Sequence, residues 1–138
     1  MNESLLIIAI VFACVLGGLS YAASKMLKRK KPLDIPYFTA KWQTAQALCN
    51  NKETWPLAII NADNLLDEAL KKNHYKGKSM GERLAAAQRD LSDNDGVWYG
   101  HKLRNKLVHE NEVKLTKHDV KDALLGIRQA LRDLGALK

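Results

Sequence analysis

The feature that most constrains this chain is an unbroken run of uncharged, mostly apolar residues from Leu5 to Ala23. As a helix rising about 1.5 Å per residue, the run would extend about 28 Å, which is close to the hydrocarbon thickness of a bilayer. The two glycines inside it do not argue against a helix, because transmembrane helices tolerate glycine. Tyr21 lies near one end, where an amphipathic ring suits the membrane interface. The sequence therefore predicts a transmembrane anchor over residues 1–24, with membrane lipid as its partner.

Positive charge follows the apolar run and does not precede it. Residues 25–31 carry five Lys or Arg side chains and no acid, whereas the N-terminal flank holds only Glu3 and the free amine. Basic flanks stay on the cytoplasmic side, so we expect a single-pass protein with its N-terminus outside and its C-terminal domain in the cytoplasm. A cleaved signal peptide is the alternative, with residues 20–22 as its cleavage site. We favour the anchor, because signal peptides carry their positive charge before the apolar core.

The basic flank also explains most of the net charge. The chain has 22 Lys and Arg against 15 Asp and Glu, a net charge of +7. Without the five cations of residues 25–31 and without Glu3, residues 32–138 hold 17 cations against 14 acids, a net charge of +3. The flank is therefore a topology signal that also suits anionic lipid headgroups. By itself it is not evidence for nucleic-acid binding.

The remainder of the chain has the pattern of an all-α bundle. No segment alternates apolar and polar residues as a strand would, and aromatic residues make up only 7% of the chain. Apolar periodicity and capping residues predict about five short helices, which short loops make antiparallel neighbours. The expected helices cover residues 39–50, 54–72, 79–91, 97–109 and 116–134. Residues 32–38 contain two prolines and are predicted to be extended, so we divide the chain into a basic segment and linker (25–38) and a bundle (39–138).

The candidate chemistry lies on the predicted helix 97–109. On a wheel at 100° per residue its apolar residues form one continuous arc, and Arg104 falls inside that arc. A buried arginine is costly unless it is paired or hydrogen-bonded. The simpler interpretation is a structural ion pair with Asp63 or Asp67, at the edge of the apolar face of helix 54–72. The alternative is a site in which Arg104 faces a groove and binds an anion.

Other polar residues accompany Arg104 on this helix. His101, Asn105 and His109 follow one another at intervals of four residues beside the apolar arc. That spacing could form a metal-binding edge, but neutral Asn is a poor ligand and no cysteine is near, so we expect no metal. The sequence has no phosphate-binding glycine motif, and its two cysteines fit no zinc or disulfide pattern.

The stretch Arg104-Asn105-Lys-Leu-Val-His109 resembles the Arg-polar-x-x-x-His signature of HEPN domains (higher eukaryotes and prokaryotes nucleotide-binding). His101-x-Leu103 before it matches the commoner bacterial form of that signature. A helical bundle over residues 39–134 also suits the family. The resemblance implies a homodimer in which two Arg…His motifs meet in one cleft. Many such domains are metal-independent endoribonucleases, and others are inactive binding or scaffold modules.

The resemblance also implies a role for each motif residue. Arg104 would hold the scissile phosphate and stabilise its developing charge. His109 would act as general base or acid on the ribose 2′-hydroxyl and the leaving oxygen, and Asn105 would orient the histidine or the phosphate. We assign substrate binding to the remaining polar residues of the helix, which are His101, Lys102 and Lys106. The product would be a 2′,3′-cyclic phosphate, formed without a cofactor.

Two functions are therefore carried forward. The first is a membrane-anchored domain that binds or cleaves RNA as a homodimer through Arg104, Asn105 and His109. The second is a non-catalytic module that recruits a protein partner to the membrane, with Arg104 structural.

The three tryptophans are expected in the core. A basic strip on helix 116–134 is interpreted as a solvated face, with an RNA track as the alternative; it consists of Lys121, Arg128 and Arg132.

Overall fold

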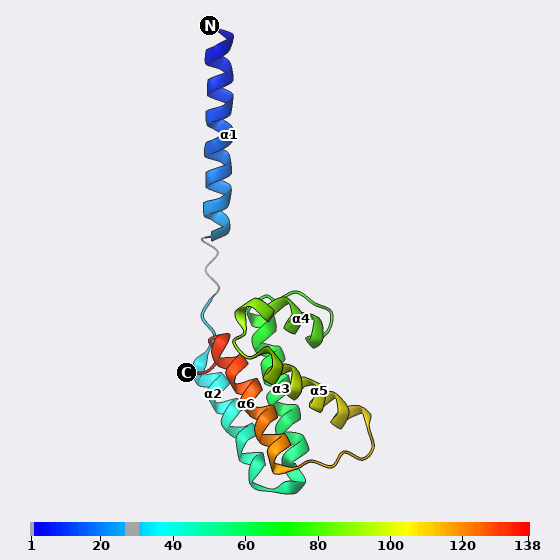
Figure 1. The fold of residues 1–138 in the computed structure, drawn as a ribbon. Helices are drawn as coiled ribbons and strands as arrows, with labels where there is room; N and C mark the ends of the chain where they lie inside the picture. Colours follow the sequence, from blue (N-terminus) through cyan, green and yellow to red (C-terminus); the bar gives the residue numbers. More distant parts are fainter. Residues whose placement is uncertain (1, 27–30) are drawn as a thin grey trace. The chain divides into compact units, whose positions relative to one another are not determined.

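The structure, a computed structural model, describes residues 2–26 and 31–138, except for the side chains of residues 24–26. Residues 27–30, in the middle of the predicted basic segment, lie outside the described residues. The chain divides into two compact units, Met1–Lys31 and Pro32–Lys138. The described residues contain helices and no strand, with α1 in the first unit and α2 to α6 in the second (Figure 1). The predicted all-α class, an apolar N-terminal helix followed by a small helical bundle, is confirmed.

Helix α1 (Glu3–Met26) carries the apolar run. No side chain of Glu3–Ala23 is buried within the structure, and Ile8 and Phe12 are 64% and 65% exposed. Leaving so many apolar side chains in water is unfavourable, because each exposes surface that a lipid or protein environment would remove from water. By length and composition, α1 can cross a membrane.

Helix α2 (Ile35–Ala47) begins four residues before the predicted position. The Asp34 carboxylate accepts a hydrogen bond from the Tyr37 N–H at 3.0 Å, which caps the helix. Pro36 lies in the first turn, where the missing N–H costs nothing. The prediction that residues 32–38 form an extended linker is therefore wrong for residues 35–38, because one of the prolines used to support it lies in the first turn of a helix. The side chain of Phe38 is fully buried.

The other helices begin and end close to the predicted positions. Helix α5 starts three residues earlier than expected, because Asp93 accepts a hydrogen bond from the Gly96 N–H and caps it there. Short 3₁₀ turns η1 to η3 extend or link the longer helices. The bounds are η1 (Leu48–Asn50), η2 (Lys52–Thr54), α3 (Trp55–Lys72), α4 (Met80–Ala87), η3 (Gln88–Asp90), α5 (Asn94–His109) and α6 (Lys117–Asp133).

Helix α3 is central, since it contacts α2, α4, α5 and α6. The core lies around it and is built only from residues of the second unit. Trp42 is buried there, and Trp55 and Trp98 are half-buried against it. The largest fully buried apolar side chains are Phe38, Ile59, Leu66, Leu70, Leu84, Ile127 and Leu131.

Helices α5 and α6 approach each other through glycine. A Cβ atom on Gly126 would lie 2.2 Å from the backbone carbonyl of Gly96, and one on Gly100 would lie 3.0 Å from the Ala123 oxygen. Neither position has room for a larger side chain without backbone movement. This contact holds one side of α5 against α6 and leaves the neighbouring side facing α3 and α4, where the predicted site residues lie.

Candidate functional site

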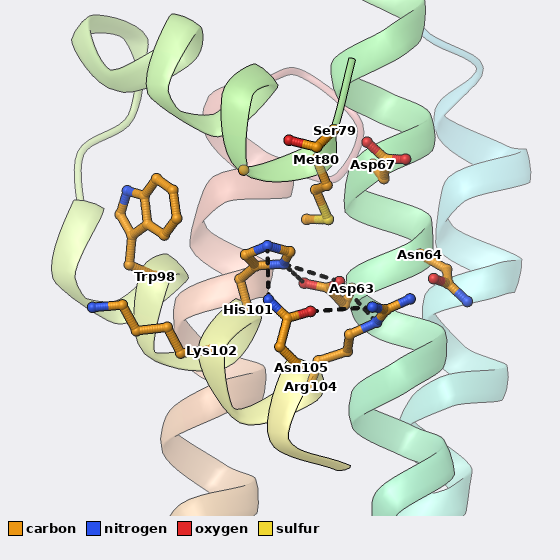
Figure 2. A pocket seen from close by; sticks show the side chains of 11 residues that line it. Asp63, Asn64, Asp67, Ser79, Met80, Trp98, His101, Lys102, Arg104 and Asn105 are labelled. Carbon is orange, nitrogen blue, oxygen red and sulfur yellow. Dashed lines mark hydrogen bonds and ion pairs between the residues drawn. The ribbon is translucent and has the colours of Figure 1, made fainter. Parts of the chain in front are cut away.

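A pocket of about 550 Å³ lies where α5, α3 and the start of α4 meet (Figure 2). We call it the Arg104 pocket. It brings together four of the six predicted site residues, all from α5: His101, Lys102, Arg104 and Asn105. Its other lining residues are Asp63, Asn64 and Asp67 from α3, Ser79, Met80 and Gly81 from the start of α4, and Trp98 from α5.

Two of the six predicted residues do not line the Arg104 pocket. Lys106 is exposed on the outer face of α5. His109 is the last residue of α5 and is also exposed. It lies five positions after Arg104, so the two side chains leave an ideal helix about 140° apart. Within one chain, the structure does not place Arg104 and His109 in a shared opening.

Four side chains in the pocket form a closed ring of polar contacts (Figure 2). The Nδ1 atom of His101 lies 3.1 and 3.2 Å from the carboxylate oxygens of Asp63. Its Nε2 atom lies 3.3 Å from the Asn105 amide nitrogen. The Asn105 oxygen accepts from Nη1 of Arg104 at 3.1 Å, and Nε of Arg104 lies 3.5 Å from Asp63. Asp63 therefore faces Arg104 directly and is also linked to it through His101 and Asn105.

This ring of contacts also selects one tautomer for a neutral His101 imidazole. Because the Asn105 oxygen accepts from Arg104, its NH₂ group faces His101 and donates to Nε2. The ring proton of a neutral His101 then resides on Nδ1 and points at Asp63. Asp63 is 1% exposed, so this contact and the nearby guanidinium are what compensate its burial.

Arg104 is held less firmly than Arg83, the other arginine packed against α3. Arg83 donates from Nε and Nη2 to both oxygens of Asp67, at 2.7 and 2.9 Å, and from Nη1 to the Gly77 carbonyl at 2.9 Å. The Nε atom of Arg104 is buried without a hydrogen bond, and among the described residues only Asn105 accepts from its guanidinium. Arg83 has the complete pairing of a structural arginine, and Arg104 does not.

Both carboxylates of the pocket already have cationic or hydrogen-bonding partners within the protein. Burial alone would raise the pKa of Asp67, but hydrogen bonds from Arg83 and Lys71 outweigh it and lower the pKa below its ordinary value. Asp63 faces His101 and Arg104. Lys102 lines the pocket and is exposed. Both lining carboxylates thus already face cations of the protein, whereas Lys102 has no ion-pair partner among the described residues and is available to an anionic ligand.

The start of α4 supplies the opposite wall. Ser79 caps this helix by accepting from the Glu82 N–H at 3.2 Å, and the first intrahelical hydrogen bond runs from the Arg83 N–H to the Ser79 carbonyl. The N–H groups of Met80 and Gly81 precede that bond and have no acceptor within the helix. A capping box between Ser79 and Glu82 is only half formed, because the Glu82 carboxylate accepts from the Lys78 N–H and not from the Ser79 N–H.

Trp98, Met80 and Ser79 are pocket residues that the sequence did not identify. Trp98 makes an edge contact with His101, with ring centroids 5.9 Å apart and an angle of 72° between the planes. The spacing of Trp98, His101 and Asn105 along α5 puts them on one helical stripe, which is a signal that could have placed Trp98 in the site. The same spacing could not identify Ser79 and Met80, because they lie on a different helix, at the start of α4.

No cluster of three or more His, Cys, Asp or Glu side chains suited to a metal ion occurs among residues 2–26 and 31–138. Comparison of the chain with protein-family models found no match, and comparisons with curated proteins and with solved structures found none either. The likeness to HEPN domains therefore stays a hypothesis that rests on the motif and on the helical class of the bundle.

Proposed function

We propose that the chain holds residues 32–138 at the cytoplasmic face of a membrane, where the Arg104 pocket binds the phosphate backbone of RNA. The length and apolar character of α1 support the membrane anchor. The five cations of residues 25–31, which directly follow the apolar run, support a cytoplasmic location for the second unit.

The observation that carries the proposal is the incomplete pairing of Arg104. Its side chain is 27% exposed at the pocket, its Nε has no hydrogen-bond partner, and Asp63 approaches it only to 3.5 Å. Phosphate oxygens can accept two parallel N–H bonds from one guanidinium, which is a geometry that Asp63 does not provide. Because Nε is buried, a bound phosphate would pair with the Nη atoms at the exposed end of the Arg104 side chain.

Two neighbouring groups would bind the same anion. The ammonium of Lys102 is available at the pocket rim. The N–H groups of Met80 and Gly81 lie at the positive end of α4, where helices commonly bind phosphate. Trp98 and the Met80 thioether provide an apolar wall against which a base can pack. The motif resemblance to HEPN domains favours RNA over other phosphates.

Cleavage would require a second copy of the chain. The general base expected at His109 is exposed and does not line the pocket of its own chain. A homodimer that brought His109 of a second copy to the Arg104 pocket would supply it. The position of His109 also suits a pocket that binds RNA without cleaving it. In the second candidate function, a non-catalytic module that recruits a protein partner to the membrane, Arg104 is structural instead. Two experiments distinguish these functions.

Binding is tested by titrating a fluorescent single-stranded RNA with the 32–138 fragment and recording its anisotropy. Arg104→Gln and Lys102→Gln should each weaken binding about tenfold and reduce the salt dependence by about 0.7 in the log–log slope. Lys106→Gln removes the same charge one turn away, outside the pocket, and should change the affinity by less than about twofold. Equal losses in Lys102→Gln and Lys106→Gln would show that binding is diffuse and does not use the pocket.

Cleavage is tested by incubating the fragment with mixed RNA in the presence of EDTA. The enzyme hypothesis predicts products with 2′,3′-cyclic phosphate ends that disappear in both Arg104→Gln and His109→Gln. Binding without products, unchanged by His109→Gln, supports a pocket that binds RNA without cleaving it. If no RNA binds and Arg104→Gln unfolds the domain, Arg104 is structural and the RNA function is wrong.

A further inference from the structure

One face of α6 carries positive charge around an exposed leucine. Lys121, Leu125, Arg128 and Arg132 follow at intervals of four, three and four residues, which places them on a single stripe of the helix. All four are exposed, and Leu125 is 51% exposed. The stripe extends about 17 Å along the helix axis. We call it the α6 basic face.

The acids of α6 do not neutralise this face. Asp119 accepts from Thr116 and Tyr99, and Asp133 accepts from Ser92. Asp122 faces His118 at 3.0 Å. In the described part of the chain, no carboxylate lies within ion-pair distance of a cation of the α6 basic face. The cations of the face therefore lack ion-pair partners among the described residues, and an apolar residue lies between them.

A groove of about 290 Å³ runs beside this face, between α6 and α2. Ile35, Trp42 and Leu137 contribute apolar lining, and Arg128 and Lys138 contribute positive charge. The groove reaches Ile35, the first residue of α2, and the C-terminus lies beside the beginning of α2 in Figure 1. The α6 basic face is thus continuous with the end of the domain at which the chain arrives from α1.

We propose that the α6 basic face docks on anionic lipid headgroups of the membrane that α1 spans. This inference rests on the membrane anchoring proposed above and is independent of the RNA site. Residues 27–34 connect α1 to α2, and eight residues span at most about 28 Å when fully extended. Such a short tether keeps the domain close to the lipid surface, so that weak contacts are made at high effective concentration.

The composition of the face favours lipid over nucleic acid. Each cation close to an anionic leaflet strengthens binding about fivefold. Leu125 can enter the headgroup region, whereas it offers nothing to a phosphate backbone. Trp42, an aromatic residue that lines the groove together with Arg128, is 7% exposed and cannot stack on a base.

The test uses the full chain in lipid nanodiscs, with both cysteines replaced by alanine. A nitroxide label on Leu125→Cys reports access of a water-soluble relaxation agent to the α6 basic face. The same label on Ala85→Cys, exposed on α4, is the control. With anionic lipid, access at residue 125 should fall at least threefold relative to zwitterionic lipid, and access at residue 85 should not change. Equal access at residue 125 in the two lipids would overturn the proposal.

Charge reversal separates a specific face from general attraction. The substitutions Lys121→Glu, Arg128→Glu and Arg132→Glu should together restore access at the label. An equal charge change at exposed sites elsewhere, made by Lys76→Glu, Lys78→Glu and Arg89→Glu, should not. Identical effects of the two sets would overturn the proposal, as would protection of the label by RNA in detergent without lipid. A chain that fails to co-elute with the discs refutes the anchor and the docking together. A chain that co-elutes with an unprotected label refutes the docking alone.

Discussion

Two arginines, Arg83 and Arg104, pack against α3. Replacing each of them with glutamine should lower the free energy of unfolding by different amounts. Arg83 makes three hydrogen bonds, two of them to both oxygens of Asp67. Removing one partner of a buried ion pair costs about 3–5 kcal/mol. Because Asp67 keeps Lys71 as a partner at 2.8 Å, the lower end of that range applies. We expect Arg83→Gln to lower the free energy of unfolding by about 3 kcal/mol.

Arg104→Gln should cost less. The guanidinium of Arg104 makes one hydrogen bond, to the neutral Asn105, which contributes about 1 kcal/mol. At 3.5 Å from Asp63, the attraction is about 5 kcal/mol at an effective dielectric constant of about 20, and desolvation of the buried groups offsets most of it. His101 also stays opposite Asp63 in the variant. We therefore expect a total loss of about 1–2 kcal/mol.

The measurement is urea unfolding of the 32–138 fragment at neutral pH, followed by far-ultraviolet circular dichroism. Arg89→Gln, at an exposed position on η3, is the control and should change stability by less than about 0.5 kcal/mol. If Arg104→Gln is as destabilising as Arg83→Gln, Arg104 is a structural arginine and the proposed anion site is wrong.

Three further substitutions test the fold. Burial alone would raise the pKa of Asp133, but hydrogen bonds from the backbone and hydroxyl of Ser92 outweigh it and lower the pKa. Asp133 therefore stabilises the fold above the unfolded pKa of about 3.9, and this contribution is lost as the pH falls through the lower folded value. Asp133→Asn should flatten the acid limb of the stability curve, and an unchanged acid limb would contradict this. Gly126→Ala places a methyl group against the Gly96 backbone, so it should lower the free energy of unfolding by about 3 kcal/mol or prevent folding. A melting temperature equal to that of the native chain would refute the close approach of α5 and α6. His74 has a φ of 63° at the end of α3, so His74→Gly should stabilise the fold by about 0.5–1 kcal/mol in urea unfolding, and a loss of stability would show that the left-handed backbone is not strained.

Local sequence signals were sufficient for most of the helical layout. The Thr116–Asp119 capping box that starts α6 is present with both of its hydrogen bonds. The start of α2 was missed because proline occurs in two helical contexts. It interrupts the interior of a helix, but it is also favourable in the first turn. The hydrogen bond from the Tyr37 N–H to Asp34 shows that Pro36 lies in a first turn.

The candidate site was predictable only in part. The helical wheel identified Arg104 as a cation on an apolar face and named Asp63 and Asp67 as its candidate partners. The wheel could not show which of the two acids faces Arg104. Asp67 pairs with Arg83, which lies on α4, so Asp63 is the acid that faces Arg104. The contact of His101 with Asp63 spans 38 residues and depends on how α5 packs against α3 and α6. Such long-range packing leaves no local signal in the sequence.

The exposed position of His109 shows a further limit. A motif fixes the spacing of two residues along the chain but not the direction in which each side chain points. Because His109 ends α5, it lies outside the pocket of its own chain, although its spacing from Arg104 matches the signature. A second copy is the only source of this imidazole that the proposed cleavage could use.

The most direct test of anion binding at Arg104 is a nuclear magnetic resonance titration of the 32–138 fragment with single-stranded RNA. It follows the side-chain Nε–H signals of Arg104 and Arg83, assigned by substitution of each residue. If RNA phosphate completes the pairing of Arg104, its signal should shift and exchange more slowly with water as RNA is added. The Arg83 signal should stay in place, because Asp67 and Gly77 already satisfy that side chain. An Arg104 signal that does not move while RNA binds elsewhere would contradict the proposed site.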